Sequence, residues 1–362
     1  MNRFSGFIIL HLIFFLTWTL SAQVQTSERG EVLNFEATYT GDIVNNFHGG
    51  LKNGSAYLGM ANMQVSFDAE KAGVLKRTKF FLQATNTHGA LPSKELFGDL
   101  QGASNIEAGN HTFLQEFWVE ISLSEFRITA GLQDLNVEFA SSESASLFLN
   151  SSFGILPVIS ANIQAPIFPL TSLGITSCWT INDKTSWITA VYDGSPTDFD
   201  FNPYNTNWQF NTGDGILIIT ELQRSMRFHE LDGLYKLGFY THNHFIEARF
   251  DIEFPDSLYH TTYGVYAYAD QKIWQKESKF IGIFTQLGFS PSEACFNKMY
   301  VGFGVNACGL FEQKNPGTLG LAVAHLDIFG NPGSETTFEL TYQKQITENV
   351  FIQPDIQYMI NP

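Results

Sequence analysis

The stretch from Ile246 to Phe254 alternates without a break between apolar and charged side chains. Every second position is apolar, and the four positions between are Glu247, Arg249, Asp251 and Glu253. A period of two indicates a β-strand whose two faces meet different environments. Four ions on one face fit neither a packed core nor lipid, because each unpaired ion there costs several kcal/mol. The charged face must therefore meet water.

The same alternation recurs along the chain in short units. Early examples are Leu33 to Thr40 and Tyr57 to Asp68, and later units are separated by turns such as Asn315-Pro316-Gly317 and Asn331-Pro332-Gly333. Strands of about nine to eleven residues with one apolar face suit a wall between lipid and water. No unit suggests a separate domain. We expect one all-β domain over residues 23–362, a transmembrane antiparallel β-barrel.

Composition agrees with a barrel in a membrane. Aromatic residues make up 15% of the chain, as much as all charged residues together, which is too rich for disorder. Outer-membrane barrels need such residues for the lipid-facing band and the girdles at its edges. The formal net charge of −16 disfavours a nucleic-acid partner.

The N-terminus has the pattern of a secretory signal peptide. Arg3 precedes an apolar run from about Phe7 to Leu20, which is too short for a comfortable membrane-spanning helix. We expect cleavage after Ala22, so that residues 1–22 are removed. The net charge then moves from −16 to −17, because Arg3 is lost and no acidic residue is.

The stretch from Gly98 to Glu120 passes from a polar, loop-like run into an alternating strand. One face of that strand is expected to carry Phe113, Gln115, Phe117, Val119 and Ile121, and the opposite face Glu116, Trp118 and Glu120. In the next alternating unit, Arg127 falls on the face opposite Phe126 and Ile128. Carboxylates, an indole and a guanidinium are therefore expected on the water-facing side of neighbouring strands.

This stretch resembles the signature of the carbohydrate-selective porins of bacterial outer membranes, the OprB-like family. Further segments look like other blocks of that family: Gly131–Phe139, Asn150–Pro157, Tyr192–Pro196, Gly233–Gly238 and Ile352–Pro362. The resemblance covers roughly Leu33 to Pro362. It implies a monomeric barrel of about sixteen antiparallel strands in the outer membrane, with no enzymatic activity and no cofactor, through which small sugars diffuse passively.

The chain departs from the family pattern at its end. The family normally continues past the last block into a closing strand that ends on an aromatic residue, whereas this sequence stops at Pro362. An open strand edge cannot face hydrocarbon. We therefore expect either a truncated form or a barrel that is closed by a different strand pairing.

A sugar that crosses a pore loses part of its hydration, so the wall must offer hydrogen bonds weak enough to release it. Carboxylates and amides accept from hydroxyl groups, a guanidinium donates, and an aromatic face stacks on a pyranose. The residues of this kind that we expect to line the pore are Asn105, Glu107, Glu116, Trp118, Glu120 and Arg127. The alternative is that Asn105 and Glu107 only brace a loop, and that the strand charges form ion-pair ladders across the lumen.

No catalytic or metal-binding residue is predicted. His242 and His244 lack a third ligand at a fitting spacing. Cys178, Cys295 and Cys308 fit no metal motif, and three free thiols are favoured over a Cys295–Cys308 staple.

The expected partners are mono- or oligosaccharides, outer-membrane lipid and the outer-membrane assembly machinery. An outer-membrane barrel enzyme and a soluble, secreted β-rich sugar-binding module remain as alternatives. A Ser/His pair near the extracellular rim would support the enzyme, and solubility without detergent would support the secreted module.

Overall fold

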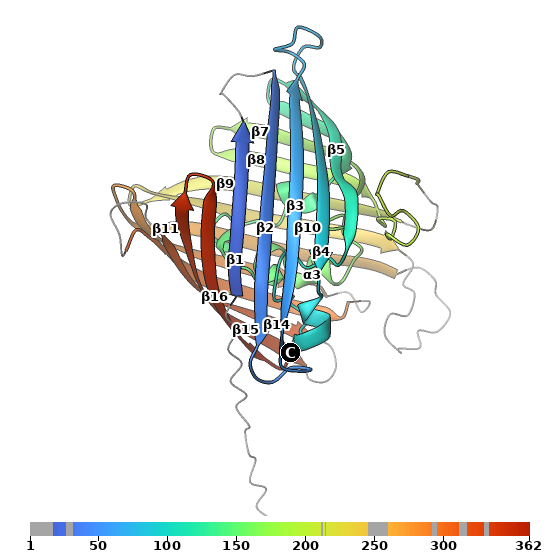
Figure 1. Cartoon of the computed structure of the whole chain (residues 1–362). Helices are drawn as coiled ribbons and strands as arrows, with labels where there is room; N and C mark the ends of the chain where they lie inside the picture. Colours follow the sequence, from blue (N-terminus) through green and yellow to red (C-terminus); the bar gives the residue numbers. More distant parts are fainter. Residues whose placement is uncertain are drawn as a thin grey trace, which may run out of the picture.

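The computed structural model describes residues 17–26, 32–210, 213, 215–244, 260–291, 295–310, 317–328 and 333–362. The strands of these residues form one closed antiparallel barrel, in which each strand pairs with its neighbours in sequence and β1 pairs with β16 (Figure 1). The expected all-β barrel is thereby confirmed. The strand expected from Ile246 to Phe254 lies outside the described residues.

The sixteen strands in this part of the chain are β1 (Thr17–Thr26), β2 (Leu33–Asn46), β3 (Gly54–Asp68), β4 (Thr78–Gly89), β5 (His111–Leu123), β6 (Phe126–Gln133), β7 (Ser172–Asn182), β8 (Thr185–Asp193), β9 (Ile216–Phe228), β10 (Leu231–His244), β11 (His260–Lys276), β12 (Lys279–Phe289), β13 (Asn297–Cys308), β14 (Thr318–Ile328), β15 (Ser334–Thr347) and β16 (Val350–Ile360). The short helical turns are η1 (Ser93–Phe97), α1 (Leu135–Glu138), η2 (Ala145–Leu147), α2 (Ser151–Gly154) and α3 (Pro157–Ser160). Among the described residues, no helix is long and apolar enough to cross a membrane.

The two ends of the barrel differ in their connections. At one end, two-residue turns join β5 to β6, β7 to β8, β9 to β10, β11 to β12 and β15 to β16. His229 and Glu230 in the β9–β10 turn both have positive φ, 48° and 66°, as in the turn type whose twist matches a hairpin. We call this the short-turn end. The opposite, long-loop end carries long connections, including residues 90–110 and 134–171.

The period-two pattern places side chains as expected on β2 and β3. Leu33, Phe35, Tyr57 and Met63 are exposed on the outer face of the barrel. The residues between them pair across the strands on the inner face, as Thr38 does with Asn62. Apolar residues therefore face outward and polar residues face the lumen.

The predicted facing is wrong for the first part of β5. Gln83 on β4 pairs with Glu116 but the next residue pairs with Leu114, so Gln115 is an extra residue in a β-bulge. A bulge reverses the alternation, and Phe113 consequently faces inward opposite Thr85 rather than outward with Phe117. Phe113 and Gln115 are only 2% and 3% exposed. The sequence pattern alone has no mark of this insertion, because either register alternates equally well.

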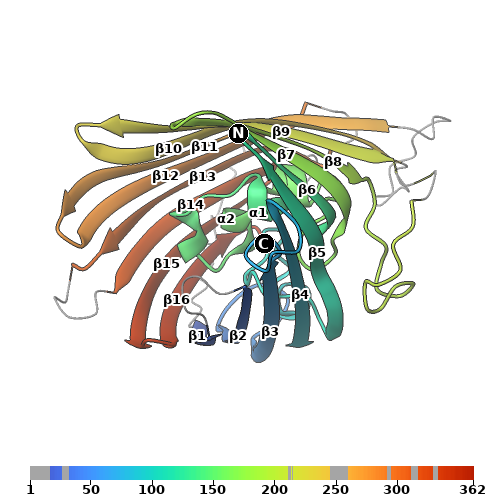
Figure 2. The same ribbon diagram turned by 90° about the horizontal axis from the view of Figure 1, so that it is seen from above.

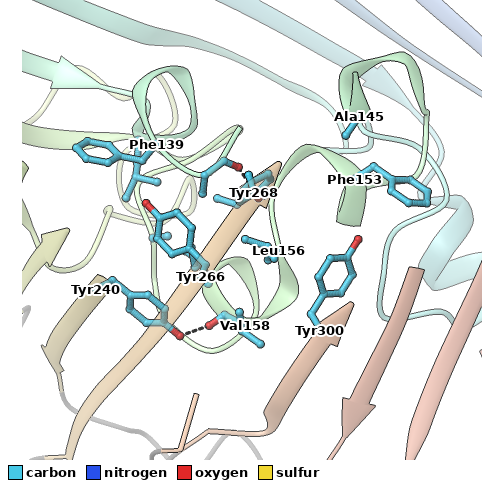
Figure 3. Close-up of a cluster of buried hydrophobic side chains, with 14 of the residues drawn as sticks. Phe139, Ala145, Phe153, Leu156, Val158, Tyr240, Tyr266, Tyr268 and Tyr300 are labelled. Carbon is cyan, nitrogen blue, oxygen red and sulfur yellow. Dashed lines mark hydrogen bonds between the residues drawn. The ribbon is translucent and has the colours of Figure 1, made fainter. Parts of the chain in front are cut away.

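The connection between β6 and β7, residues 134–171, turns into the barrel, and we call it the inner segment. Figure 2 shows α1 and α2 inside the ring of strands. Apolar side chains of the inner segment, among them Phe139, Phe153 and Leu156, form a core with inward-facing residues of the wall such as Tyr266 and Tyr300 (Figure 3). The inner face of β8 to β14 is thereby covered by a packed apolar core.

Wall side chains also satisfy the backbone of the inner segment. The hydroxyl group of Tyr240 donates to the carbonyl oxygen of Val158 (Figure 3). The hydroxyl groups of Tyr268 and Tyr300 donate to the carbonyl oxygens of Ala140 (2.6 Å) and Ser152 (2.9 Å). Glu339 on β15 accepts the backbone N–H groups of Leu149 (2.6 Å) and Asn150 (3.0 Å). A buried irregular segment needs such partners because its backbone groups lack a helix or sheet ladder. These contacts fix the inner segment to the β9–β16 side.

The seam of the barrel involves the N-terminal strand. β1 lies between β2 and β16 (Figure 1), and its β16 partners run from Thr17, which pairs with Asp355, to Ala22, which pairs with Val350. The full chain is thus closed by a strand pairing that the expected cleavage after Ala22 would remove, so this closure decides between the two expectations only for the uncleaved chain. All β1–β16 pairs lie in residues 17–22, within the stretch for which the sequence predicts removal.

Candidate pore constriction

The structure brings four of the six predicted pore residues together with a fifth residue that the sequence did not indicate. Glu116, Trp118 and Glu120 lie on the inner face of β5, and Arg127 lies on the inner face of β6. Glu138, the last residue of α1, faces them from the inner segment. We call these five residues the constriction group.

An ion pair joins the wall to the inner segment. The two Nη atoms of Arg127 donate to the two carboxylate oxygens of Glu138 at 2.6 and 2.8 Å, and Nη1 also lies 3.4 Å from Glu120. Such two-pronged pairs fix orientation as well as charge. The side chains are 32% exposed for Arg127 and 24% for Glu138, so solvent reaches both. The bridge is therefore in contact with solvent.

Trp118 provides an aromatic face beside this bridge. Its ring stacks on Phe81 of β4 with centroids 4.9 Å apart and planes inclined by 21°. Its indole N–H donates to Glu116 at 3.2 Å, which fixes the ring orientation. Both rings are half-buried. An apolar platform next to hydrogen-bonding groups suits the two faces of a sugar ring.

A ladder of amide side chains continues this wall toward β3. Gln64 donates to Gln83 at 2.9 Å, and Thr85 donates to Asn62 at 2.7 Å. Asn62, Gln64 and Gln83 are half-buried and face the lumen. We did not predict these as pore residues. The signal was present in the alternation of Asn62 and Gln64 with the outward-facing Ala61 and Met63.

Asn105 and Glu107 lie in the connection between β4 and β5, apart from the two strands of the constriction group. Both carboxylate oxygens of Glu107 accept the backbone N–H of Ser93 at the start of η1, at 3.2 and 3.1 Å. Burial raises the pKa of Glu107 to about 7, and its hydrogen bonds to Ser93 oppose that shift. The backbone N–H of Asn105 donates to Leu149 of the inner segment at 2.8 Å, and its side chain is exposed.

A cavity of about 720 Å³ opens toward the short-turn end. Residues of η2 and its flanks line it on the inner-segment side, and the barrel wall contributes groups of both charges, among them Arg227, Asp232, Asp270 and Lys272. None of the six predicted residues lines this cavity. The cavity is a vestibule of mixed charge on the opposite side of the inner segment from β4 and β5.

The remaining reactive side chains show no built site. All three cysteines are free thiols, with Cys295 buried and Cys178 half-buried on the lumen face opposite Arg127. The ring of His242 is hydrogen-bonded to the carbonyl oxygen of Gly194 at 2.6 Å. Within the described ranges, no group of three or more His, Cys, Asp or Glu residues is arranged to hold a metal ion.

Residues 52–362 match the protein family described as "Carbohydrate-selective porin, OprB family". The chain belongs to the OprB family. The protein is an outer-membrane porin, a channel for the passive diffusion of sugars and not an enzyme. The fold, the membrane and the function class expected from the sequence are thereby confirmed.

Solved structures agree on the fold. OprB of Pseudomonas putida in its high-pH structure has a TM-score of 0.74 and 13% identity, over 96% of this chain and 93% of that one. Its low-pH structure has a TM-score of 0.53 and 12% identity, over 97% and 92%. At such identity the likeness concerns the fold alone. The curated proteins contain no significant match to this sequence.

Proposed function

We propose that sugars cross the barrel along the inner face of β2 to β6, between that wall and the inner segment. One contrast carries this proposal. The inward side chains of β8 to β14 include many fully buried apolar residues, such as Ile219 and Phe284, whereas those of β3 to β5 include the half-buried Gln64, Gln83 and Trp118. Water and solutes need a polar, accessible surface, and the second wall offers one alongside the inner segment.

Residues on this path supply the contacts that a neutral sugar needs. Gln64 and Gln83 use the remaining donor and acceptor positions of their amide groups to hydrogen-bond sugar hydroxyl groups. The Phe81–Trp118 stack contacts the apolar face of the sugar ring. Arg127 donates and Glu120 accepts on the same face of the wall. Each contact is weak and replaceable by water, so a sugar is both admitted and released.

The expected roles of the six predicted residues separate into two groups. Trp118 and Arg127 line the path directly, and Glu116 and Glu120, which are only 6% and 9% exposed, bond to them. Glu107 and the backbone of Asn105 act through the connection that they brace, which approaches the path from the long-loop end. This division is supported by the contact of Glu107, whose two carboxylate oxygens both accept the backbone N–H of Ser93.

Orientation follows from the porin architecture. Outer-membrane barrels have short periplasmic turns and longer extracellular loops, so the short-turn end, where the mixed-charge vestibule opens, faces the periplasm. We further propose that residues 1–22 are an export signal, that the exposed outer residues such as Phe35 and Met63 contact lipid, and that the outer-membrane assembly machinery inserts the barrel. Small monosaccharides and short oligosaccharides are the proposed substrates.

Swelling of proteoliposomes tests the path. We expect wild-type vesicles to swell faster in mono- and disaccharides than in amino acids of similar size. Trp118→Ala and the double variant Glu107→Gln with Arg127→Ala are expected to reduce that preference, whereas Gln345→Ala, an exposed change at the short-turn end, leaves it unchanged. Unchanged sugar flux and conductance in the double variant would remove Glu107 and Arg127 from the path. Equal swelling with sugars and amino acids in the wild type would contradict carbohydrate preference itself.

A further inference from the structure

Gln115, the extra residue of the β5 bulge, contacts both ends of the inner segment. Its side-chain amide donates to the Asp134 carboxylate at 2.9 Å, and its carbonyl oxygen accepts the hydroxyl of Thr171 at 2.6 Å. Asp134 and Thr171 are the first and last residues of the inner segment. One inserted residue thus closes the base of a 38-residue connection between β6 and β7.

The contact is buried and strongly polar. Gln115, Asp134 and Thr171 are 3%, 9% and 1% exposed. Asp134 also accepts the backbone N–H groups of Asn136 at 2.9 Å and Phe168 at 3.0 Å. Burial raises the pKa of Asp134 to about 6, so above that pH an ionised carboxylate depends on these donors. An amide at position 115 is therefore part of what makes the buried charge tolerable.

Asp134 transmits this contact to the constriction group. It is the N-cap of α1, because its side chain accepts from the N–H of Asn136. α1 is a single turn that ends in Glu138, the partner of Arg127. The end of this turn is held separately, since Ala140 bonds to Glu221 at 2.9 Å and to Tyr268. Gln115 is therefore bonded to the residue that caps the start of α1, the helix that carries Glu138.

The bulge itself is stabilised from the outer connection between β8 and β9. Asn205 is 2% exposed, and its side-chain amide donates to the carbonyl of Leu114 at 3.1 Å and to the hydroxyl of Thr171 at 2.9 Å. The N–H of Leu114 donates to Tyr204 at 3.0 Å. A bulge leaves backbone groups without a partner in the sheet. Here Tyr204 and Asn205 of the β8–β9 connection supply partners for the N–H and the carbonyl oxygen of Leu114. The insertion at Gln115 is thus held in place rather than tolerated as an irregularity.

We propose that Gln115 is the positioning residue of the pore constriction. Its clasp on Asp134 and Thr171 sets where α1 presents Glu138 to Arg127, and thereby the width and sugar preference of the path. This inference rests on the proposed function, because it assumes that the constriction group borders the sugar path. Bulges are over-represented beside functional sites, where they redirect side chains.

Labelling of a native thiol tests the positioning without using sugar. Cys178 faces Arg127 from β7 and packs partly against the apolar core that includes Leu135 of α1, so we expect displacement of α1 to increase its exposure. In Gln115→Ala we expect labelling of Cys178 by a charged thiol reagent, followed by peptide mass spectrometry, to accelerate roughly 5- to 10-fold, as for the loss of one buried hydrogen bond. Gln345→Ala is the control and should match the wild type.

Two further variants distinguish positioning from simple packing. Gln115→Glu sets two carboxylates against each other, which coexist only when they share a proton. Its labelling rate should be near that of the wild type at pH 5 and raised at pH 8. Adding Asp134→Asn restores a hydrogen bond of reversed polarity to position 115, and Asn remains a good N-cap. Its amide nitrogen cannot accept the N–H of Phe168, which bonds to the same Asp134 oxygen as Gln115 does. The double variant should therefore recover part of the difference from the wild type at pH 8. Both variants keep the test open if Gln115→Ala fails to fold.

Sugar flux then links the clasp to selectivity. Gln115→Ala should lose most of the sugar preference in swelling while its conductance in KCl rises. An unchanged Cys178 rate in Gln115→Ala would overturn the positioning role. So would a Gln115→Glu rate that, relative to the wild type at the same pH, does not rise from pH 5 to pH 8 and is not lowered by Asp134→Asn. If the wild type shows no sugar preference but the variants still change the labelling of Cys178, the positioning role of Gln115 is kept and the proposed sugar path is refuted.

Discussion

The Arg127–Glu138 bridge allows charge and geometry at the constriction to be separated. Glu116, Glu120 and Glu138 contribute three formal negative charges around the single positive charge of Arg127, which is −3 + 1 = −2 for the group. Arg127→Ala makes this −3, and Glu138→Gln makes it −1. The double variant Arg127→Ala with Glu138→Gln has a formal charge of −2 again, as in the wild type, but lacks the bridge.

A unit charge roughly 6 Å from a permeating ion in water contributes about 0.7 kcal/mol, or roughly a 3-fold change in a permeability ratio. In a KCl gradient across a planar bilayer, the reversal potential should therefore show about 3-fold higher cation selectivity for Arg127→Ala. Glu138→Gln should lower it by a similar factor. The double variant should have the wild-type selectivity.

Sugar transport should respond differently from ion selectivity. The double variant lacks the bridge that joins β6 to α1, so its swelling preference for sugars should fall although its reversal potential is that of the wild type. A double variant that shifts the reversal potential as far as Arg127→Ala does would show that the formal charge of this group does not act on permeating ions. A double variant with unchanged sugar preference would show that the bridge is not part of the sugar path.

Three further results are expected. In the wild type, a charged thiol reagent should modify Cys178 faster than the buried Cys295, and equal rates would contradict the lumen position of Cys178. The pKa of Glu107 rises on folding from 4.5 to about 7, so its contribution to stability is present below pH 4.5 and is lost as the pH rises through 7. Thermal unfolding in detergent should show Glu107→Gln gaining about 1–3 kcal/mol over the wild type at pH 8 but not at pH 4, unlike the exposed control Glu70→Gln. Mass spectrometry of the outer-membrane protein should find Gln23 as the N-terminal residue, and a retained Thr17–Ala22 stretch would contradict the signal-peptide interpretation.

The pattern of the sequence was sufficient for the barrel wall. Alternation in β2 and β3 predicted which residues face outward, because a strand has only two faces and one of them must meet an apolar environment. The same logic placed Glu116, Trp118, Glu120 and Arg127 on one surface. It failed at Phe113 and Gln115, since a single inserted residue leaves the alternation intact on either side while it exchanges the faces.

The sequence by itself determined the class of protein, through the period of its strands, its aromatic content and its family blocks. Only the tertiary structure decided which part of the lumen is open. The inner segment has no period that predicts its location, because hydrogen bonds from distant wall residues such as Tyr268, Tyr300 and Glu339 replace its own secondary structure. Glu138 becomes a neighbour of Arg127 only after that segment has folded against the wall.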